Sequence, residues 1–126
     1  MKKGILAIVV MLLAIGLQAQ DFSNKGREFW LCFPSHVPTD ITTLAQMGLF
    51  LTSDRNSSGT ISVGTWSVPF TVVANQVTGP VDVPYFTASL TISATGVFAD
   101  KGIHVQVNAG QPPVVLYAHI YADARS

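Results

Sequence analysis

The sequence predicts an all-β domain of the antiparallel sandwich class, and three observations lead to this prediction. Apolar and polar side chains alternate with a period of two in several short segments, and turns rich in Gly, Pro and Asn separate them by about ten residues. Val, Ile, Thr and aromatic residues dominate, whereas no stretch carries apolar residues at helical spacing over three turns. With 48% apolar and 11% charged residues among 126, the chain has the composition of a folded domain.

The first 19 residues have the pattern of a secretory signal peptide. Two lysines precede an apolar stretch from Gly4 to Leu17, and Ala19 provides a small residue for cleavage before Gln20. This stretch is shorter than the roughly 20 residues of a spanning helix, so we expect no membrane span after cleavage. The mature domain is then residues 20–126, exported to the cell surface, the extracellular space or the periplasm.

Charge and motif content narrow the function of the mature domain. Five basic and seven acidic residues remain after cleavage, which gives a formal charge of −2 with His neutral. Nucleic acid or an anionic membrane would need a basic patch, so we expect neither as a partner. The sequence shows no glycine-rich phosphate loop, no Gly-x-Ser-x-Gly turn and no marked pair of carboxylates. We therefore expect a protein that is not an enzyme and that binds no cofactor.

The N-terminal part of the domain begins with a strongly apolar segment. Glu28 to Phe33 is continuously apolar after its first residue, which predicts a strand covered on both faces. Trp30 is accordingly expected in the core, and Cys32 is expected to be a small buried hydrophobe without a partner for a disulfide. Residues 41–47 are ambiguous, with a helical turn as one option, and Gly48 to Thr52 is predicted to be a strand.

The segment from Asp54 to Gly59 resembles the opening half of a calcium loop. Oxygen-bearing residues occupy its first, third and fifth positions, and a glycine follows. The acid expected at the twelfth position is replaced by Thr65, so a polar hairpin turn is the favoured interpretation. Asn56, Ser57 and Ser58 also form a glycosylation sequon, which implies an exposed loop.

The middle of the domain is predicted to contain three strands. In the first strand, Ile61 and Val63 share one face. In the second, which follows a bend at Val68–Pro69, Phe70 and Val72 share one face. Residues 75–84 are predicted to form a loop or a short edge segment. The third strand is Ser89 to Ala94, where apolar and polar residues alternate.

The last two strands show the clearest alternation, at 103–108 and 114–121, with a turn at 109–113 between them. If they form a hairpin, His104 and His119 lie on one face, either roughly opposite each other or one register apart. With Asp100 or Asp123 they would be candidate metal ligands, but a cross-strand polar pair facing solvent is the favoured interpretation. The sequence stops directly after the last strand, so we expect the sheet to be incomplete there and to associate through an exposed edge.

Side chains that could contact a ligand are aromatic or imidazole groups on predicted strand surfaces. Trp66 lies between Thr65 and Ser67 near a turn and is the better surface candidate of the two tryptophans. The predicted ligand-binding set is Trp66, His104, Tyr117, His119 and Tyr121.

Two ordered blocks of the sequence carry specific motifs. The first is Asp21 to Pro34, which contains Lys-Gly-Arg-Glu-Phe-Trp, and the second is Asp100 to Val105, followed by Pro113 to Ala118. Together these blocks resemble the N-terminal domain family of IgGFc-binding protein. Residues 70–75 and 81–84 are similar to less specific parts of the family pattern. The resemblance covers Asp21 to Tyr121, whereas the family domain continues past this point, so it implies a truncated member. Bacterial relatives are exported surface proteins with adhesive modules.

The sequence therefore predicts an exported, non-catalytic binding or adhesion module of a bacterial surface protein. It would recognise a protein or glycan ligand outside the cell through a sheet face or through end loops. Two alternatives stay open: a metal-dependent accessory domain of a hydrolase or lyase that uses His104, His119 and an Asp, and an inert spacer within a larger surface protein.

Overall fold

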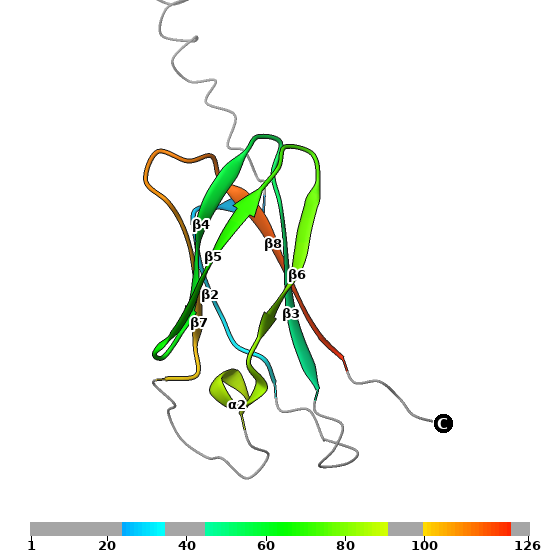
Figure 1. Cartoon of the computed structure of the whole chain (residues 1–126), viewed down its shortest axis with the longest axis vertical. Coiled ribbons are helices and arrows are strands. Elements are labelled where there is room, and N and C mark those ends of the chain that lie inside the picture. Colours follow the sequence, from blue (N-terminus) through cyan, green and yellow to red (C-terminus); the bar gives the residue numbers. More distant parts are fainter. Residues whose placement is uncertain (1–23, 35–44, 91–99, 122–126) are drawn as a thin grey trace, which may run out of the picture.

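The structure, a computed structural model, describes residues 24–34, 45–90 and 100–121 and contains two four-stranded antiparallel sheets packed face to face (Figure 1). In sheet A the strand order is β1 (Lys25–Gly26), β8 (Val114–Tyr121), β3 (Gln46–Thr52) and β6 (Val77–Val83). In sheet B the order is β2 (Glu28–Leu31), β7 (Ile103–Val107), β4 (Ser57–Val63) and β5 (Trp66–Val72). A single-turn helix, α2 (Tyr85–Ala88), follows β6. The predicted all-β sandwich is confirmed.

The core lies between the sheets and consists of the inward-facing residues of the middle strands. Leu49 and Leu51 from sheet A meet Ile61, Ile103 and Val105 from sheet B, and all five are completely buried. Each such side chain contributes about 1.5–3 kcal/mol when it leaves water. The alternation predicted in the strands that became β4, the end of β5 and β7 is therefore confirmed, because their inward residues are the buried ones.

The last two strands do not form the hairpin that the sequence left open. β7 pairs with β2 and β4 in sheet B, whereas β8 pairs with β1 and β3 in sheet A, so the segment between them crosses from one sheet to the other. Pro112 and Pro113 lack amide hydrogens and cannot extend a ladder. Their carbonyl oxygens instead accept hydrogen bonds from two buried serines, Ser57 Oγ to Pro112 at 2.7 Å and Ser53 Oγ to Pro113 at 2.9 Å.

The interpretation of Glu28 to Phe33 as a strand covered on both faces is also wrong. The chain passes from sheet A to sheet B at Arg27, and β2 becomes the last strand of sheet B. Its alternate side chains face solvent. Trp30 is 68% exposed and Cys32 is exposed, although both were expected to be buried.

Several boundaries in the middle of the chain differ from expectation. Pro69 lies inside β5 without ending it, because β5 is an edge strand where a missing amide hydrogen is tolerated. Residues 75–84 contain β6, which lies at the edge of sheet A but, at seven residues, is longer than the short edge segment expected. β3 begins at Gln46. The ambiguous residues 41–44 and most of the strand expected at Ser89 to Ala94 lie outside the described residues.

The turn after β3 is a polar turn, and β4 begins within it at Ser57. Asp54 forms an ion pair with Lys25 of β1 at 3.3 Å, and the hydrogen bond from Lys25 is the main cause that lowers the pKa of Asp54. Asn56 Oδ1 accepts a hydrogen bond from the Ala74 amide at 2.9 Å. These oxygens are thus engaged in joining β1 and the β5–β6 turn to this end of the sandwich.

Candidate functional site

The outer face of sheet B carries a flat array of polar side chains with one exposed tryptophan. Cross-strand register places Trp30, His104, Ser62 and Ser67 in one row across the four strands. The neighbouring row consists of Glu28, Gln106, Thr60 and Pro69. We call the surface formed by these two rows the Trp30 face.

Three residues of the Trp30 face form a tight cluster. The Trp30 indole and the His104 imidazole are stacked, with ring centroids 4.1 Å apart and an interplanar angle of 9°. His104 Nε2 lies 3.0 Å from Glu28 Oε1. Glu28 and Trp30 lie two residues apart on β2 and therefore point to the same side of the sheet. The carboxylate thus orients the imidazole, and the imidazole supports one face of the indole.

Trp30 remains largely exposed despite this support. The His104 ring covers one face of the indole, so most of the 68% exposure belongs to the opposite face and the ring edges. Gly102 lies next to the indole, because a Cβ atom at this position would be 3.7 Å from Trp30 Cε3. A large apolar ring held in one orientation at the surface has the properties of a ligand contact, because little of its conformational entropy would be lost on binding.

The outer face of sheet A carries a second aromatic group. Tyr117 of β8 lies opposite Phe50 of β3, and His119 stacks on Tyr121 with ring centroids 5.1 Å apart. The Tyr121 hydroxyl donates a hydrogen bond of 2.6 Å to Gln46 Oε1. Tyr117 is 56% exposed. We call Phe50, Tyr117, His119 and Tyr121 the tyrosine face.

The five residues predicted to bind a ligand are divided among three places. His104 belongs to the Trp30 face, and Tyr117, His119 and Tyr121 belong to the tyrosine face on the other side of the sandwich. Trp66 is partly buried and packs against the core, so the expected roles of the two tryptophans are reversed. Trp30 was not predicted to be a surface residue. The alternation along β2 could have indicated its exposure: residues two apart on a strand share a face, so a solvent-facing Glu28 places Trp30 on the solvent side too.

His104 and His119 do not share a face, so the geometry that the metal alternative requires is absent. The two side chains point outward from different sheets, and packed sheets are about 10 Å apart. They therefore cannot ligate one ion. Within 24–34, 45–90 and 100–121, no three His, Cys, Asp or Glu side chains come together as metal ligands do. Asp123 lies outside these ranges.

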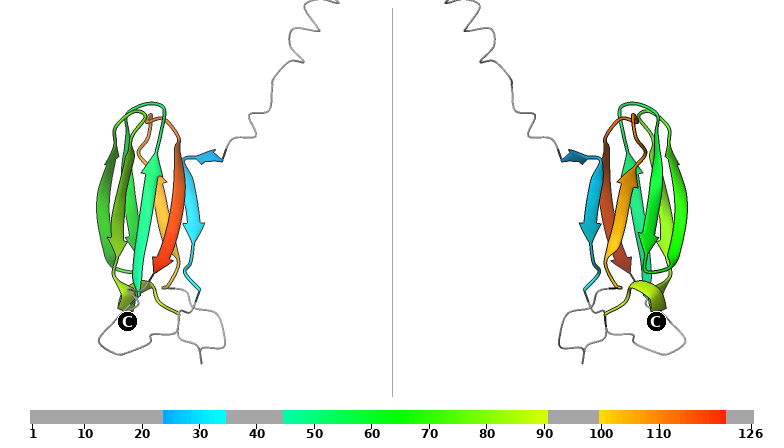
Figure 2. Two further views of the ribbon diagram at one scale, coloured as in Figure 1. Left: turned by 90° about the vertical axis from the view of Figure 1, so that its right-hand side faces the viewer. Right: turned by 90° about the vertical axis from the view of Figure 1, so that its left-hand side faces the viewer.

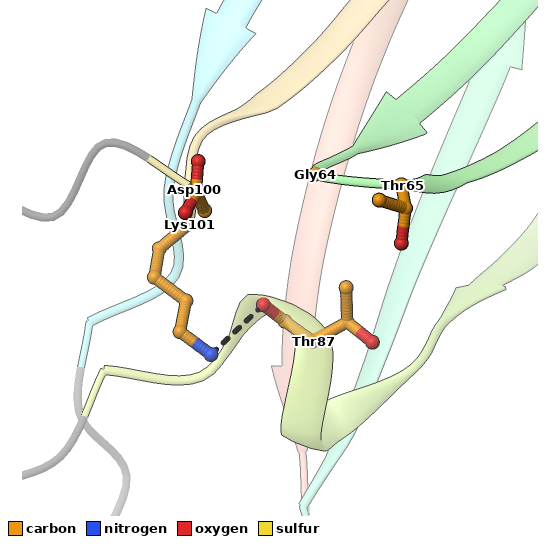
Figure 3. A pocket seen from close by; sticks show the side chains of 5 residues that line it. All are labelled: Gly64, Thr65, Thr87, Asp100 and Lys101. Carbon is orange, nitrogen blue, oxygen red and sulfur yellow. Dashed lines mark hydrogen bonds between the residues drawn. The ribbon is translucent and has the colours of Figure 1, made fainter.

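A shallow pocket lies at the end of the sandwich beside α2 and is lined by Gly64, Thr65, Thr87, Asp100 and Lys101 (Figure 3). Lys101 extends across it to the helix, where its ammonium group donates to the carbonyl oxygens of Phe86 at 2.9 Å and Thr87 at 3.0 Å. The cation is thus engaged in joining the start of β7 to the end of α2, which is a structural role.

Comparison of the chain with protein-family models, curated proteins and solved structures finds no match. Within the described ranges, no helix has both the length and the apolar character of a membrane span.

Proposed function

We propose that this chain is an exported, non-catalytic binding module that holds a glycan on the Trp30 face of sheet B. The exposed indole of Trp30, fixed by its stack on His104, is the observation that carries the proposal. The signal-peptide pattern and the resemblance to the IgGFc-binding N-terminal domain family support export and binding. No cofactor or catalytic group is part of the proposal.

A glycan is favoured over a protein because of what surrounds Trp30. The open face of an indole packs against the apolar C–H face of a sugar ring, and the sugar hydroxyl groups need hydrogen-bond partners nearby. Glu28 offers carboxylate oxygens, Gln106 an amide, and Thr60 and Ser62 hydroxyl groups, all on the same flat surface. The centre of a protein interface is usually depleted in such charged and polar groups.

A protein ligand is the second candidate, and the tyrosine face of sheet A favours it. Tyrosine is enriched at protein interfaces, and Tyr117 lies directly opposite Phe50 in the strand register of this surface. The inert-spacer alternative assigns no ligand to either face.

The proposal is tested by presenting the purified chain to immobilised glycans and, separately, to immobilised extracellular proteins. We expect retention on one or more glycans, unchanged by a metal chelator because the Trp30 face contains no metal-ligand set. Retention on proteins alone would favour the tyrosine face instead. Absence of retention on both supports would favour the spacer alternative.

A further inference from the structure

β8 is the longest strand of the described structure, but one of its two edges is mostly open. β3 pairs with it from Gln46 opposite Tyr121 to Thr52 opposite Val115. On the other edge, β1 pairs only with Val114 and Val115. Among the described residues, no strand pairs with the edge from Leu116 to Tyr121; β2, which is drawn next to β8 in Figure 2, belongs to sheet B and pairs with β7. Every second residue there, about three in all, directs its amide and carbonyl groups to this open side.

The open edge of β8 also lacks the features that protect other strand edges. Edge strand β5 contains Pro69, and edge strand β6 contains Pro80 and Asp82. Proline and charged residues on an edge discourage another strand from pairing with it. Leu116 to Tyr121 contains no proline, no glycine, no Lys or Arg and no acidic residue. This edge is therefore chemically suited to accept a further strand.

The apolar side chains beneath this edge are incompletely covered by the described residues. β1 continues into β2 through Arg27, so the edges of the two sheets formed by β8 and β2 lie on the same side of the sandwich. Leu116 and Ile120 of β8 and Phe29 and Leu31 of β2 face the core but are only partly buried. Inward residues of the middle strands, such as Leu49 and Ile61, are completely buried. A strand added to β8 would cover apolar surface as well as backbone groups.

We propose that a second copy of this chain occupies the open edge, with β8 pairing antiparallel to β8 across a twofold axis. A twofold interface places the segment of one copy against the same segment of the other. Two copies of a charged strand would therefore repel each other. The segment from Leu116 to Tyr121 carries no formal charge, so it is compatible with such pairing. Opposed residues in an antiparallel pair share a sheet face, so outward residues meet outward residues. The two tyrosine faces would then join into one surface across the two paired sheets. This proposal is independent of the glycan proposal.

Sedimentation velocity of the purified chain over a range of concentrations tests the pairing. We expect a monomer–dimer equilibrium. His119→Lys places a charge on the exposed face of β8 and opposes like charge across the axis, so we expect it to weaken dimerisation at least about tenfold. Val77→Lys is the matched control: Val77 is also exposed, lies on the opposite edge of the same sheet, and gains the same charge. It should leave the equilibrium unchanged.

Amide hydrogen exchange distinguishes the occupants of the edge. If the proposal is right, alternate amides of Leu116 to Tyr121 become protected as the concentration rises, and His119→Lys removes this protection. A chain that stays monomeric at the highest concentration overturns the proposal. Equal protection of these alternate amides at all concentrations also overturns it, since the chain would then cover its own edge. A dimer that is disrupted by Val77→Lys but not by His119→Lys contradicts it as well.

Discussion

Gly59→Ala is expected to destabilise the domain by about 3 kcal/mol or more, which is enough to unfold a small domain of marginal stability. Gly59 lies in β4, between Phe70 of β5 and Val107 of β7 in the ladder. A Cβ atom at Gly59 would lie 2.6 Å from Phe70 Cζ and would also collide with the Gln106 carbonyl oxygen. The Phe70 ring occupies the space of the missing side chain, and the carbonyl belongs to a paired strand, so neither can move without loss of packing or hydrogen bonding.

Chemical denaturation with circular dichroism measures this effect, and Gly102→Ala provides the matched control. A Cβ atom at Gly102 would meet only the Trp30 ring, at ordinary contact distances of 3.7 and 3.8 Å. We expect that variant to stay within about 1 kcal/mol of the parent. Equal stability of the Gly59→Ala variant and the parent would mean that β4, β5 and β7 do not pack as described here.

Trp30→Ala is expected to weaken glycan binding by at least about thirtyfold while the domain stays folded. Loss of an aromatic hot-spot residue costs about 2 kcal/mol or more in binding. The effect on stability should be small, because Trp30 is 68% exposed and its main contact is the stack with His104. Titration calorimetry measures the loss of affinity, with a glycan that retains the chain when immobilised as the ligand. The thermal melting temperature measures the change in stability.

Tyr117→Ala serves as the control for Trp30→Ala. It also removes an exposed aromatic ring from an outward strand position, but on the opposite sheet. We expect it to leave glycan affinity within about twofold of the parent, since the two faces share no residues. The reverse pattern, a loss with Tyr117→Ala and none with Trp30→Ala, would transfer the ligand to the tyrosine face.

Side-chain alternation predicted which residues of the middle strands face inward but could not predict which strands are neighbours. Ile61, Ile103 and Val105 alternate with polar residues because one face of each strand contacts the core. The same alternation is compatible with β7 and β8 as a hairpin and with β7 and β8 in different sheets. In the structure, Ser53 and Ser57 bind the carbonyl groups of Pro113 and Pro112 where the chain crosses between the sheets, and these tertiary contacts cannot be read from alternation.

The candidate site was only partly predictable for the same reason. His104 was recognised as a polar residue on an alternating strand, and it lies on the Trp30 face. Trp30 was assigned to the core because its neighbours are apolar, and an apolar run does not reveal whether a strand lies at the centre or the edge of a sheet. Once β2 is known to be an edge strand, Glu28 and Trp30 must share the outer face. Strand order, more than residue type, thus determined which tryptophan is exposed.

Nuclear magnetic resonance of the isotope-labelled chain, titrated with a retained glycan, locates the ligand directly. We predict that the Trp30 indole signal and the signals of Glu28, His104 and Gln106 shift during the titration, while those of Tyr117, His119 and Tyr121 stay in place. Shifts confined to Tyr117, His119 and Tyr121, with the Trp30 indole signal unchanged, would contradict glycan binding on the outer face of sheet B.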